Sequence, residues 1–386
     1  MSKKVLIMTV QKAPNFGACL QAYALWKYIS DLGHDCKIID LLRPYHSDFV
    51  YTKGFDTFCK KERSWFLNFR IEYVRPFRKK LRNIFHKDTN NYNRTIPSKS
   101  FSQKLFDEFN EQVKYTKTYR SIGDLYSNPP QADLYITGSD QLWNPTQPYA
   151  LEPYFLTFVK QGKKISYATS IGVAHISKYV KRKFALWLKS YDAISVREPE
   201  AASLLQPLVQ KQIAECCDPT FLLSKESWEK LASKRQIEGK YIFLFTVGDG
   251  SSVFDYAETM SKTMNLPVIT NKDDFKKIGK YSFVIKNDIG PLEWLALIRD
   301  AEMVVTNSFH GCVFCLFMHT PFRAGISNNR GSRITNLLKQ VRCEDLLLNN
   351  NDELRPLVVD FEASDKCMKE LGEKGQNYLL QHLKQR

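Results

Sequence analysis

The sequence predicts an α/β fold made of two Rossmann-like domains that face each other across a cleft. Three observations lead to this prediction. Short β-branched runs, typical of buried parallel strands, alternate with helical patterns along most of the chain. The alternation occurs in two series, separated by a break near residues 224–240. The chain has 386 residues, 43% of them hydrophobic and 25% charged, which is enough for two globular domains with their own cores.

The first series predicts an N-terminal domain over residues 1–225. It opens with a strand at Val5–Thr9 and a helix at Gly17–Asp31, where Gly33 marks the end of the helix. A strand at Cys36–Leu41 follows, and Phe101–Tyr115 has a helical pattern. Helices near 176–190 and 197–205 alternate with the later strands, which are expected at Leu134–Thr137, Lys164–Ser170, Ala193–Val196 and Ile213–Cys216.

The second series predicts a C-terminal domain over residues 226–360. Its first strand is Tyr241–Val247, and a helix is expected from the following glycine-rich turn to about Met264. A helix at Pro291–Asp300 lies among the later strands, which are expected at Pro267–Thr270, Ser282–Ile285, Met303–Val305 and Phe322–Gly325. A last helix is expected at Phe361–Leu383, within residues 361–386, and we expect it to pack back on the N-terminal domain.

A basic segment interrupts the first series. We expect a helical insertion over about 43–120, and its part 53–98 holds many more Lys and Arg than Asp and Glu, with aromatic residues between them. This part contributes strongly to the formal net charge of +15. Basic helices with an apolar face can pack on their own domain or lie on an anionic membrane surface, and both interpretations remain open. Nucleic-acid binding is not expected, because no recognised reader motif accompanies the charge.

Composition indicates a cytoplasmic protein, with peripheral contact at the inner face of the membrane as a further expectation for 53–98. No signal peptide is recognised, and no apolar run approaches the length of about 18 residues that a membrane span needs. Nine cysteines lie among apolar neighbours, as expected for reduced, buried thiols. Cys312 and Cys315 have CxxC spacing, but no second pair with metal-ligand spacing accompanies them, so we expect no metal site.

Four turns at the ends of predicted strands carry the polar residues that point to function. In open α/β sheets, ligands bind at the carboxyl ends of the strands, where the first turn of the next helix directs N–H groups at an anion. The turns are Asn15-Phe16-Gly17 with the helical residue Gln21, Gly138-Ser139-Asp140-Gln141, Ser195-Val196-Arg197-Glu198 and Thr306-Asn307-Ser308-Phe309-His310. The first turn lacks the G-x-G-x-x-G pattern, so a nicotinamide cofactor is not expected. His310 begins a helix beside an expected anion site.

Taken in this order, the turns resemble those of the polysaccharide pyruvyl transferase family. The resemblance runs from about residue 5 to 340. The matching segments are Asn15-Phe16-Gly17-Ala18-Cys19-Leu20-Gln21-Ala22-Tyr23-Ala24-Leu25, Gly138-Ser139-Asp140-Gln141-Leu142-Trp143-Asn144, Tyr167-Ala168-Thr169-Ser170-Ile171-Gly172, Ser195-Val196-Arg197-Glu198, Asp218-Pro219-Thr220-Phe221-Leu222-Leu223 and Asn307-Ser308-Phe309-His310-Gly311. The basic segment 43–100 matches nothing in the family that we can place.

The resemblance implies a GT-B-like fold and the transfer of pyruvate from phosphoenolpyruvate to a sugar. The product would be a cyclic ketal, as on galactose, in a cell-surface polysaccharide or glycoconjugate precursor, with a lipid-linked saccharide among the candidate acceptors. No metal or other cofactor is needed for this reaction. The reaction needs a general acid that protonates the methylene carbon of phosphoenolpyruvate. His310 fits this role or that of a phosphate ligand.

The resemblance also implies which residues bind the substrates. Arg197 fits a clamp on phosphate or carboxylate. Ser308 stands where many family members carry an arginine, and Arg333 is our preferred substitute among Arg323, Arg330 and Arg333. The remaining substrate-binding candidates come from the first two turns and are Asn15, Gly17, Gln21, Ser139, Asp140 and Gln141, together with Ser308 itself.

Two other functions remain open at this point. A nucleotide-sugar glycosyltransferase would share the two-domain architecture, and the serine at position 308 is compatible with it. A non-catalytic, membrane-associated assembly protein would retain the fold and use the basic segment as an anchor.

Overall fold

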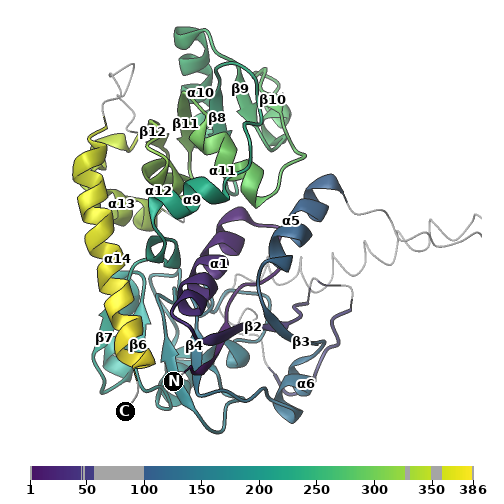
Figure 1. Ribbon diagram of the computed structural model, residues 1–386, viewed down its shortest axis with the longest axis vertical. Helices are drawn as coiled ribbons and strands as arrows, with labels where there is room; N and C mark the ends of the chain where they lie inside the picture. Colours follow the sequence, from purple (N-terminus) through teal and green to yellow (C-terminus); the bar gives the residue numbers. More distant parts are fainter. Residues whose placement is uncertain are drawn as a thin grey trace, which may run out of the picture.

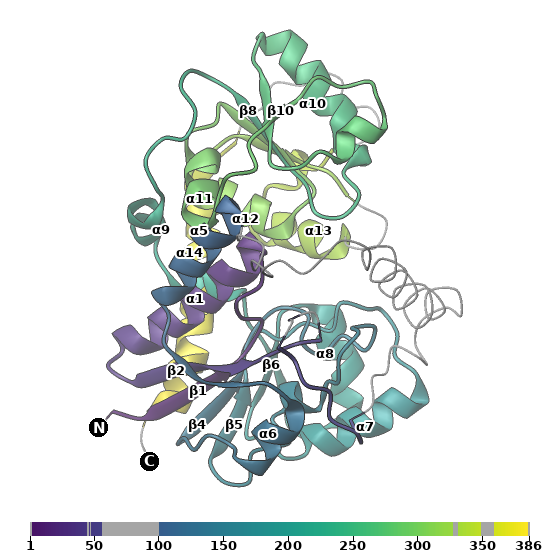
Figure 2. The same ribbon diagram turned by 90° about the vertical axis from the view of Figure 1, so that its right-hand side faces the viewer.

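The computed structural model describes residues 2–44, 46, 48–55, 100–326, 331–348 and 359–384. It contains two five-stranded parallel sheets, one above the other, with helices α1, α5, α11 and α12 in the layer between them (Figure 2). The predicted α/β fold with two Rossmann-like units in a GT-B-like arrangement is confirmed. The predicted membrane contact through 53–98 falls almost entirely on residues outside the described ranges.

The N-terminal sheet has the strand order β3-β2-β1-β4-β5, and all its pairings are parallel. Single bridges from β5 extend it toward a two-stranded continuation, β6-β7. The strands are β1 (Lys4–Met8), β2 (Asp35–Leu41), β3 (Tyr115–Tyr119), β4 (Leu134–Thr137), β5 (Lys163–Ser166), β6 (Ile194–Val196) and β7 (Ile213–Glu215). The strand order continues from β1 to β2 and β3 on one side of the sheet, and from β4 to β5 on the other. The crevice at the carboxyl ends of β1 and β4 is therefore a topological switch point.

The helices of this half cover both faces of its sheet (Figure 2). They are α1 (Phe16–Asp31), α5 (Phe101–Glu111), α6 (Ile122–Ser127), α7 (Lys178–Leu188) and α8 (Pro199–Leu205), with short 3-10 turns η2 (Glu152–Phe155), η3 (Gln206–Leu208) and η4 (Pro219–Leu222).

The sequence prediction was wrong where it continued a helix to Tyr115. Helix α5 ends at Glu111, and Tyr115–Tyr119 forms β3 at the edge of the N-terminal sheet. This segment is rich in Thr and Tyr, which favour strands, and β3 pairs with β2. The carboxylate of Asp40 on β2 accepts a 2.6 Å hydrogen bond from the Thr118 hydroxyl. The expected insertion over 43–120 is therefore not wholly helical, because its end belongs to the sheet.

The C-terminal sheet repeats the strand order of the first, as β10-β9-β8-β11-β12. Its strands are β8 (Ile242–Phe245), β9 (Val268–Thr270), β10 (Val284–Ile285), β11 (Met303–Thr306) and β12 (Phe322–Ala324). Its helices are α9 (Lys225–Leu231), α10 (Ser251–Met264), α11 (Pro291–Arg299), α12 (Phe309–Phe317) and α13 (Gly331–Gln340), with turns η5 (Asp274–Lys277) and η6 (Glu344–Leu346). The second switch point lies between β8 and β11.

An aromatic cluster joins the two halves. The ring of Phe16, at the start of α1, stacks on Trp294 of α11 with 5.4 Å between centroids. Phe106 of α5 and Phe245 of β8 lie 5.0 and 5.7 Å from the same Phe16 ring. Pairs at these separations stabilise beyond their buried area. One continuous hydrophobic core therefore contains residues of both sheets.

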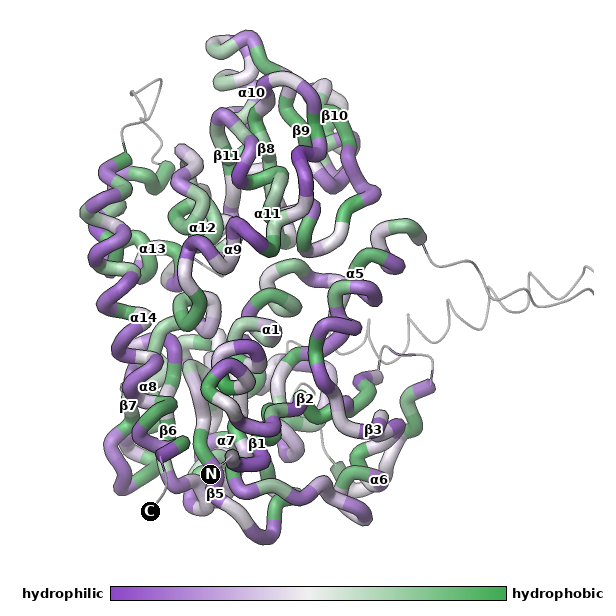
Figure 3. The backbone as a smooth tube through the Cα atoms, viewed as in Figure 1, coloured by the Kyte–Doolittle hydropathy of each residue, from purple (hydrophilic) through white to green (hydrophobic). Residues whose placement is uncertain are grey.

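The C-terminal helix α14 (Phe361–Leu383) runs along both halves on one side of the molecule (Figure 1). At its end, Tyr378 Oη donates to the carbonyl of Ser166 in β5 at 3.0 Å. In the middle, Gly372 lies so close to the Phe221 carbonyl that an added Cβ would come within 2.5 Å of it. Hydrophobic and hydrophilic residues alternate along α14 (Figure 3), as expected for a helix that packs on one side only. None of the helices in the described ranges is long and apolar enough to cross a bilayer.

Candidate active site

A cleft opens where the two switch points face each other. Four loops converge on it, because the carboxyl ends of β1, β4, β8 and β11 all point toward the space between the sheets. The cleft has roughly 1060 Å³ of empty volume, open solvent included. It is lined by Val10, Ala13, Asn15, Gly17, Ala18, Arg43, Asp140, Gln141, Gln147, Tyr149, Phe245, Val247, Asn307, Ser308, Phe309, His310, Arg333 and Ile334.

The turn before His310 is held rigidly. Ser308 is the N-cap of α12, and its hydroxyl accepts from the Gly311 N–H at 3.2 Å, a cap that typically stabilises by about 1 kcal/mol. The Asn307 side chain accepts from the Val247 N–H at 2.7 Å and donates to the Asp249 carbonyl at 2.8 Å. These two bonds connect the turn after β11 to the turn after β8, so the position of His310 is fixed by both strands of the switch point.

The imidazole of His310 rests on Gly17. A Cβ added to Gly17 would lie 2.1 Å from Nδ1 of His310, a distance that atoms cannot share. Gly17 is in the first turn of α1, whose N-cap Asn15 accepts from the Ala18 N–H at 3.0 Å. The N-termini of α1 and α12 therefore meet at the histidine, and both direct partial positive charge at the cleft.

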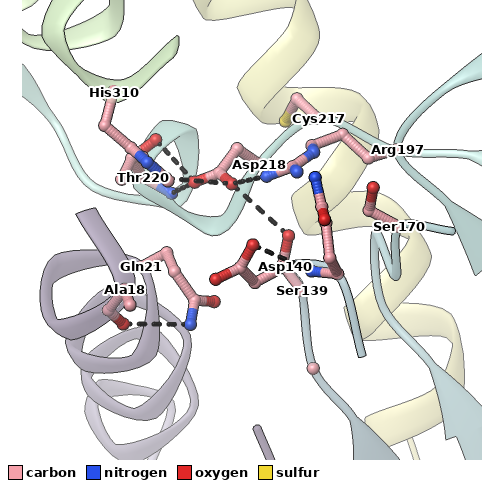
Figure 4. A network of polar contacts seen from close by, with 12 residues as sticks. Ala18, Gln21, Ser139, Asp140, Ser170, Arg197, Cys217, Asp218, Thr220 and His310 are labelled. Carbon is pink, nitrogen blue, oxygen red and sulfur yellow. Dashed lines mark hydrogen bonds and ion pairs between the residues drawn. The ribbon is translucent and has the colours of Figure 1, made fainter. Parts of the chain in front are cut away.

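Behind His310 lies a buried carboxylate, Asp218 (Figure 4). Its Oδ2 is 3.5 Å from His310 Nε2 and 2.6 Å from Arg197 Nη1. The Ser139 hydroxyl donates to the same oxygen at 3.4 Å, and the Thr220 hydroxyl and N–H donate to Oδ1. Burial alone would raise the pKa of Asp218, but His310, Arg197 and the Thr220 N–H together lower it well below its ordinary value. Asp218 is therefore a permanent anion beside the histidine.

Arg197 completes this buried group from the end of β6. Its guanidinium is also 3.5 Å from a Glu198 carboxylate oxygen and 4.9 Å from the Phe309 ring, and it lines a pocket that shares Phe309 and Arg333 with the cleft. Burial opposes its charge, yet Glu198 and Asp218 raise the pKa of Arg197 above its ordinary value. The Ser170 hydroxyl in turn donates to Glu198. The arginine thus balances two buried carboxylates.

Asp140 and Gln141 reach the cleft from the turn after β4. Asp140 adopts a left-handed backbone with φ 73°, which Asp tolerates better than most residues. The Gln141 side chain accepts from Asn144 at 2.9 Å and lies against Gly172, where an added Cβ would come within 2.6 Å of its carboxamide carbon. Gly172 also has φ 68°, so a glycine suits this position for two reasons.

Two arginines line the cleft. Arg43 follows β2 and is buried, with its Nε donating to Tyr154 Oη at 2.8 Å and its guanidinium 4.9 Å from the Tyr149 ring. Arg333 belongs to α13, a helix that the sequence analysis did not predict. Arg323, the other described candidate to replace the arginine absent at Ser308, donates to the Asp345 carbonyl and is not among the cleft-lining residues. Arg330 lies outside the described residues.

Seven of the ten site residues predicted from sequence line this cleft, namely Asn15, Gly17, Asp140, Gln141, Ser308, His310 and Arg333. The other three lie behind its surface. Gln21 is buried and donates to Thr9 Oγ1 and the Ala18 carbonyl, while Ser139 and Arg197 contact Asp218. Their positions suit support of the site better than contact with a substrate.

Sequence reasoning missed Asp218 and Arg43. Asp218 was noted within the Asp218-Pro219-Thr220 segment of the resemblance, and that segment was the available signal. No sequence feature distinguished Arg43 as a site residue, because it lies at the border of a segment rich in basic residues. Among the described residues, no group of three or more His, Cys, Asp or Glu is arranged to hold a metal ion. Cys312 and Cys315 are buried in α12, and burial raises the pKa of both thiols.

Fold and cleft together define a two-domain α/β protein whose polar site lies between two parallel sheets. The sequence model of the family described as polysaccharide pyruvyl transferase matches residues 15–330. The chain therefore belongs to the polysaccharide pyruvyl transferase family, and this membership supports a transferase.

Several solved structures have a similar fold. One is UGT89C1 of Arabidopsis thaliana complexed with UDP-L-rhamnose, with 12% identity, a TM-score of 0.45, and coverage of 98% of this chain and 91% of that one. Another is the UDP-GlcNAc 2-epimerase of Methanocaldococcus jannaschii, with 12% identity, a TM-score of 0.46, and coverage of 97% and 98%. At these values the likeness concerns the fold alone. None of the curated proteins compared with the chain matches it.

Proposed function

We propose that the protein transfers pyruvate from phosphoenolpyruvate to a saccharide and closes a cyclic ketal over two hydroxyls, with galactose as a candidate acceptor. The observation that carries the proposal is the juxtaposition of His310, backed by Asp218, with two helix N-termini and two arginines in one cleft. Family membership supports the polysaccharide pyruvyl transfer.

The donor carries two anionic groups, a phosphate and a carboxylate. Arg43 and Arg333 supply cationic side chains to the cleft, and the first turns of α1 and α12 supply outward N–H groups. The arginine absent at Ser308 is thereby replaced by cations from two other elements. Ser308 itself is committed to capping α12.

His310 is the proposed general acid toward the methylene carbon of phosphoenolpyruvate. Its Nε2 lies 3.5 Å from Asp218 and its Nδ1 lies against Gly17, so the ring is held from both sides at the cleft lining. The carboxylate of Asp218, 3.5 Å from Nε2, orients the ring, and Arg197 holds Asp218 in place. Asp218 and Arg197 are positioning residues in this proposal, because both lie behind the cleft surface.

The acceptor is expected on the wall formed by the N-terminal half, where Asn15, Gln141, Gln147 and Tyr149 offer hydrogen-bonding groups and an aromatic ring. A cytoplasmic location fits an acceptor assembled before export. For a lipid-linked acceptor, the basic segment 53–98 would keep the protein at the inner face of the membrane.

The test is turnover of phosphoenolpyruvate with a panel of 4-nitrophenyl glycosides that includes the β-galactoside. We expect phosphate release that depends on the glycoside, together with a new methyl signal of a pyruvate ketal by NMR. Phosphate release without a glycoside, or no product with any member of the panel, would contradict the proposal.

The two alternatives predict different ligand responses. A nucleotide-sugar glycosyltransferase would be stabilised against heat by a nucleoside diphosphate and not by phosphoenolpyruvate. A non-catalytic assembly protein would be stabilised by neither ligand. We expect phosphoenolpyruvate alone to raise the melting temperature.

A further inference from the structure

We propose that Asp140 is the general base that accepts the proton of the attacking acceptor hydroxyl. This inference rests on the proposed function and adds a second catalytic residue to it. Among the described residues that line the cleft, Asp140 is the one carboxylate. The other lining residues carry cationic, amide, hydroxyl or apolar side chains, together with Gly17 and His310.

The two proposed proton-transfer groups come from opposite walls. Asp140 follows β4 of the N-terminal sheet, and His310 follows β11 of the C-terminal sheet. A substrate bound between the sheets therefore lies between an acid and a base. This separation suits the reaction, since the proton donated to carbon and the proton removed from oxygen belong to different reactants.

The backbone around Asp140 holds the carboxylate at the cleft surface. The Asp140 carbonyl accepts from the N–H groups of Leu142 at 2.7 Å and Ser170 at 3.0 Å, which fixes the left-handed turn. One carboxylate oxygen, Oδ1, accepts from the Gln141 N–H at 2.8 Å. Within the described part of the chain, no hydrogen bond is made by the other oxygen, which is available to a hydroxyl.

The neighbouring residue Ser139 contacts the buried ionic group from the same turn. Its hydroxyl donates to Asp218, as the dashed contact in Figure 4 marks. One turn therefore supplies Ser139, which supports His310 through Asp218, and Asp140, which is proposed to contact the acceptor hydroxyl. A displacement of this turn would disturb both proton-transfer groups together.

The proton balance requires such a base. His310 gives one proton to the methylene carbon, and the first hydroxyl oxygen bonds to C2 while its proton passes to Asp140. The second hydroxyl oxygen then bonds to C2, the bond from C2 to the phosphate oxygen breaks, and phosphate leaves with the electron pair and the second hydroxyl proton. Afterwards Asp140 returns a proton to solvent and His310 regains one.

Two substitutions remove the carboxylate of Asp140 without straining its left-handed backbone. Both Asp140→Asn and Asp140→Gly tolerate the left-handed conformation, and neither can accept a proton as a carboxylate does. We expect kcat to fall by about 10²–10³-fold in each, with phosphoenolpyruvate binding unchanged or tighter, since a negative charge leaves the site. Formate added to Asp140→Gly should restore part of the lost turnover.

The control is Asp31→Asn, which removes an exposed carboxylate paired with Lys27 on α1, remote from the cleft lining. This variant should retain wild-type kcat. Wild-type kcat in Asp140→Asn, or loss of turnover in Asp140→Gly that formate does not relieve, would overturn the assignment of Asp140. Absence of ketal product in the wild-type protein would instead overturn the proposed function.

Discussion

The two switch points have the same strand order but different surroundings. At the C-terminal one, His310 begins a helix, α12, whose later residues are buried and apolar, and the turn is fixed by Ser308 and Asn307. At the N-terminal one, the turns after β1 and β4 lie in front of a buried ionic group made of Arg197, Asp218 and Glu198.

The comparison teaches how one topology serves two roles. In both halves, the strand order decides where a site can form, because it places the loop ends at the same crevice. The loops then decide the chemistry. The C-terminal wall offers one titratable group on a rigid apolar support, while the N-terminal wall offers a glycine surface, a carboxylate at the cleft and buried charges that orient the opposite residue.

The largest expected effect comes from removing the titratable group of the C-terminal wall. His310→Ala should lower turnover by about 10²–10⁴-fold, because the proposed proton donor is lost. The melting temperature should change little, since the ring lies at the cleft lining and α12 keeps its cap. Turnover assays with melting curves would check both points, and wild-type turnover would remove His310 from the mechanism.

The buried charges of the N-terminal half should matter for stability as well as for turnover. Asp218→Asn leaves Arg197 with less compensation, and we expect a loss of about 3 kcal/mol in the free energy of unfolding. Asp31→Asn, at an exposed pair with Lys27, should change it by less than about 0.5 kcal/mol. Denaturant titrations measure both. Equal small effects would show that the buried group does not stabilise the fold.

The stabilisation by Asp218 has a pH dependence of known sign. Since the folded pKa of Asp218 lies below its ordinary value of 3.8, its stabilisation is present above pH 3.8 and is lost as pH falls below it. We expect the Asn variant to lack this acid-dependent loss.

Contact between the two walls is tested at Gly17. Gly17→Ala should reduce turnover by about 10²-fold and destabilise by about 1–3 kcal/mol, because the new methyl group would meet the His310 ring. In the double variant with His310→Ala, the stability loss should largely disappear. A loss that persists without the ring would place the strain elsewhere.

The smallest expected effect concerns α14, which is anchored on both halves. Burial, with a further contribution from the charge of Lys163, lowers the pKa of His382 from 6.5 to about 4. Its stabilisation is therefore present above pH 6.5 and is lost as pH falls toward 4, by about 1 kcal/mol, because partial exposure screens the effect. Melting curves across this range should show the wild type losing stability on acidification relative to His382→Gln.

The existence and order of most strands could be predicted from sequence, although the strand expected at Lys164–Ser170 ends at Ser166. The strand at Leu134–Thr137 was predicted with its observed bounds, and the strand predicted at Met303–Val305 is one residue longer, because both runs stop at turns rich in Gly, Ser, Asn and Asp. The strand Tyr115–Tyr119 was missed, because it follows a helix after a short connection and is only partly buried at a sheet edge. Its pairing with β2 depends on a partner far away in sequence.

The site was readable where the chain itself makes the turn, and less so where distant residues meet. Gln21 follows the first turn, and the sequence cannot reveal that Thr9 and the Ala18 carbonyl occupy its amide group. Asp218 meets Arg197 and His310 through three separate elements, so no local pattern announces their contact. The role of each predicted residue toward substrate stays a prediction until ligands are bound.

The contact between Gly17 and His310 has a consequence for how the family can vary. The two positions are almost three hundred residues apart in the chain, yet they occupy one volume that only one of them can fill. Relatives that carry a side chain at the first position should therefore carry a smaller or displaced residue at the second. Exchange of one half between two relatives should succeed only when both members of this pair come from the same parent.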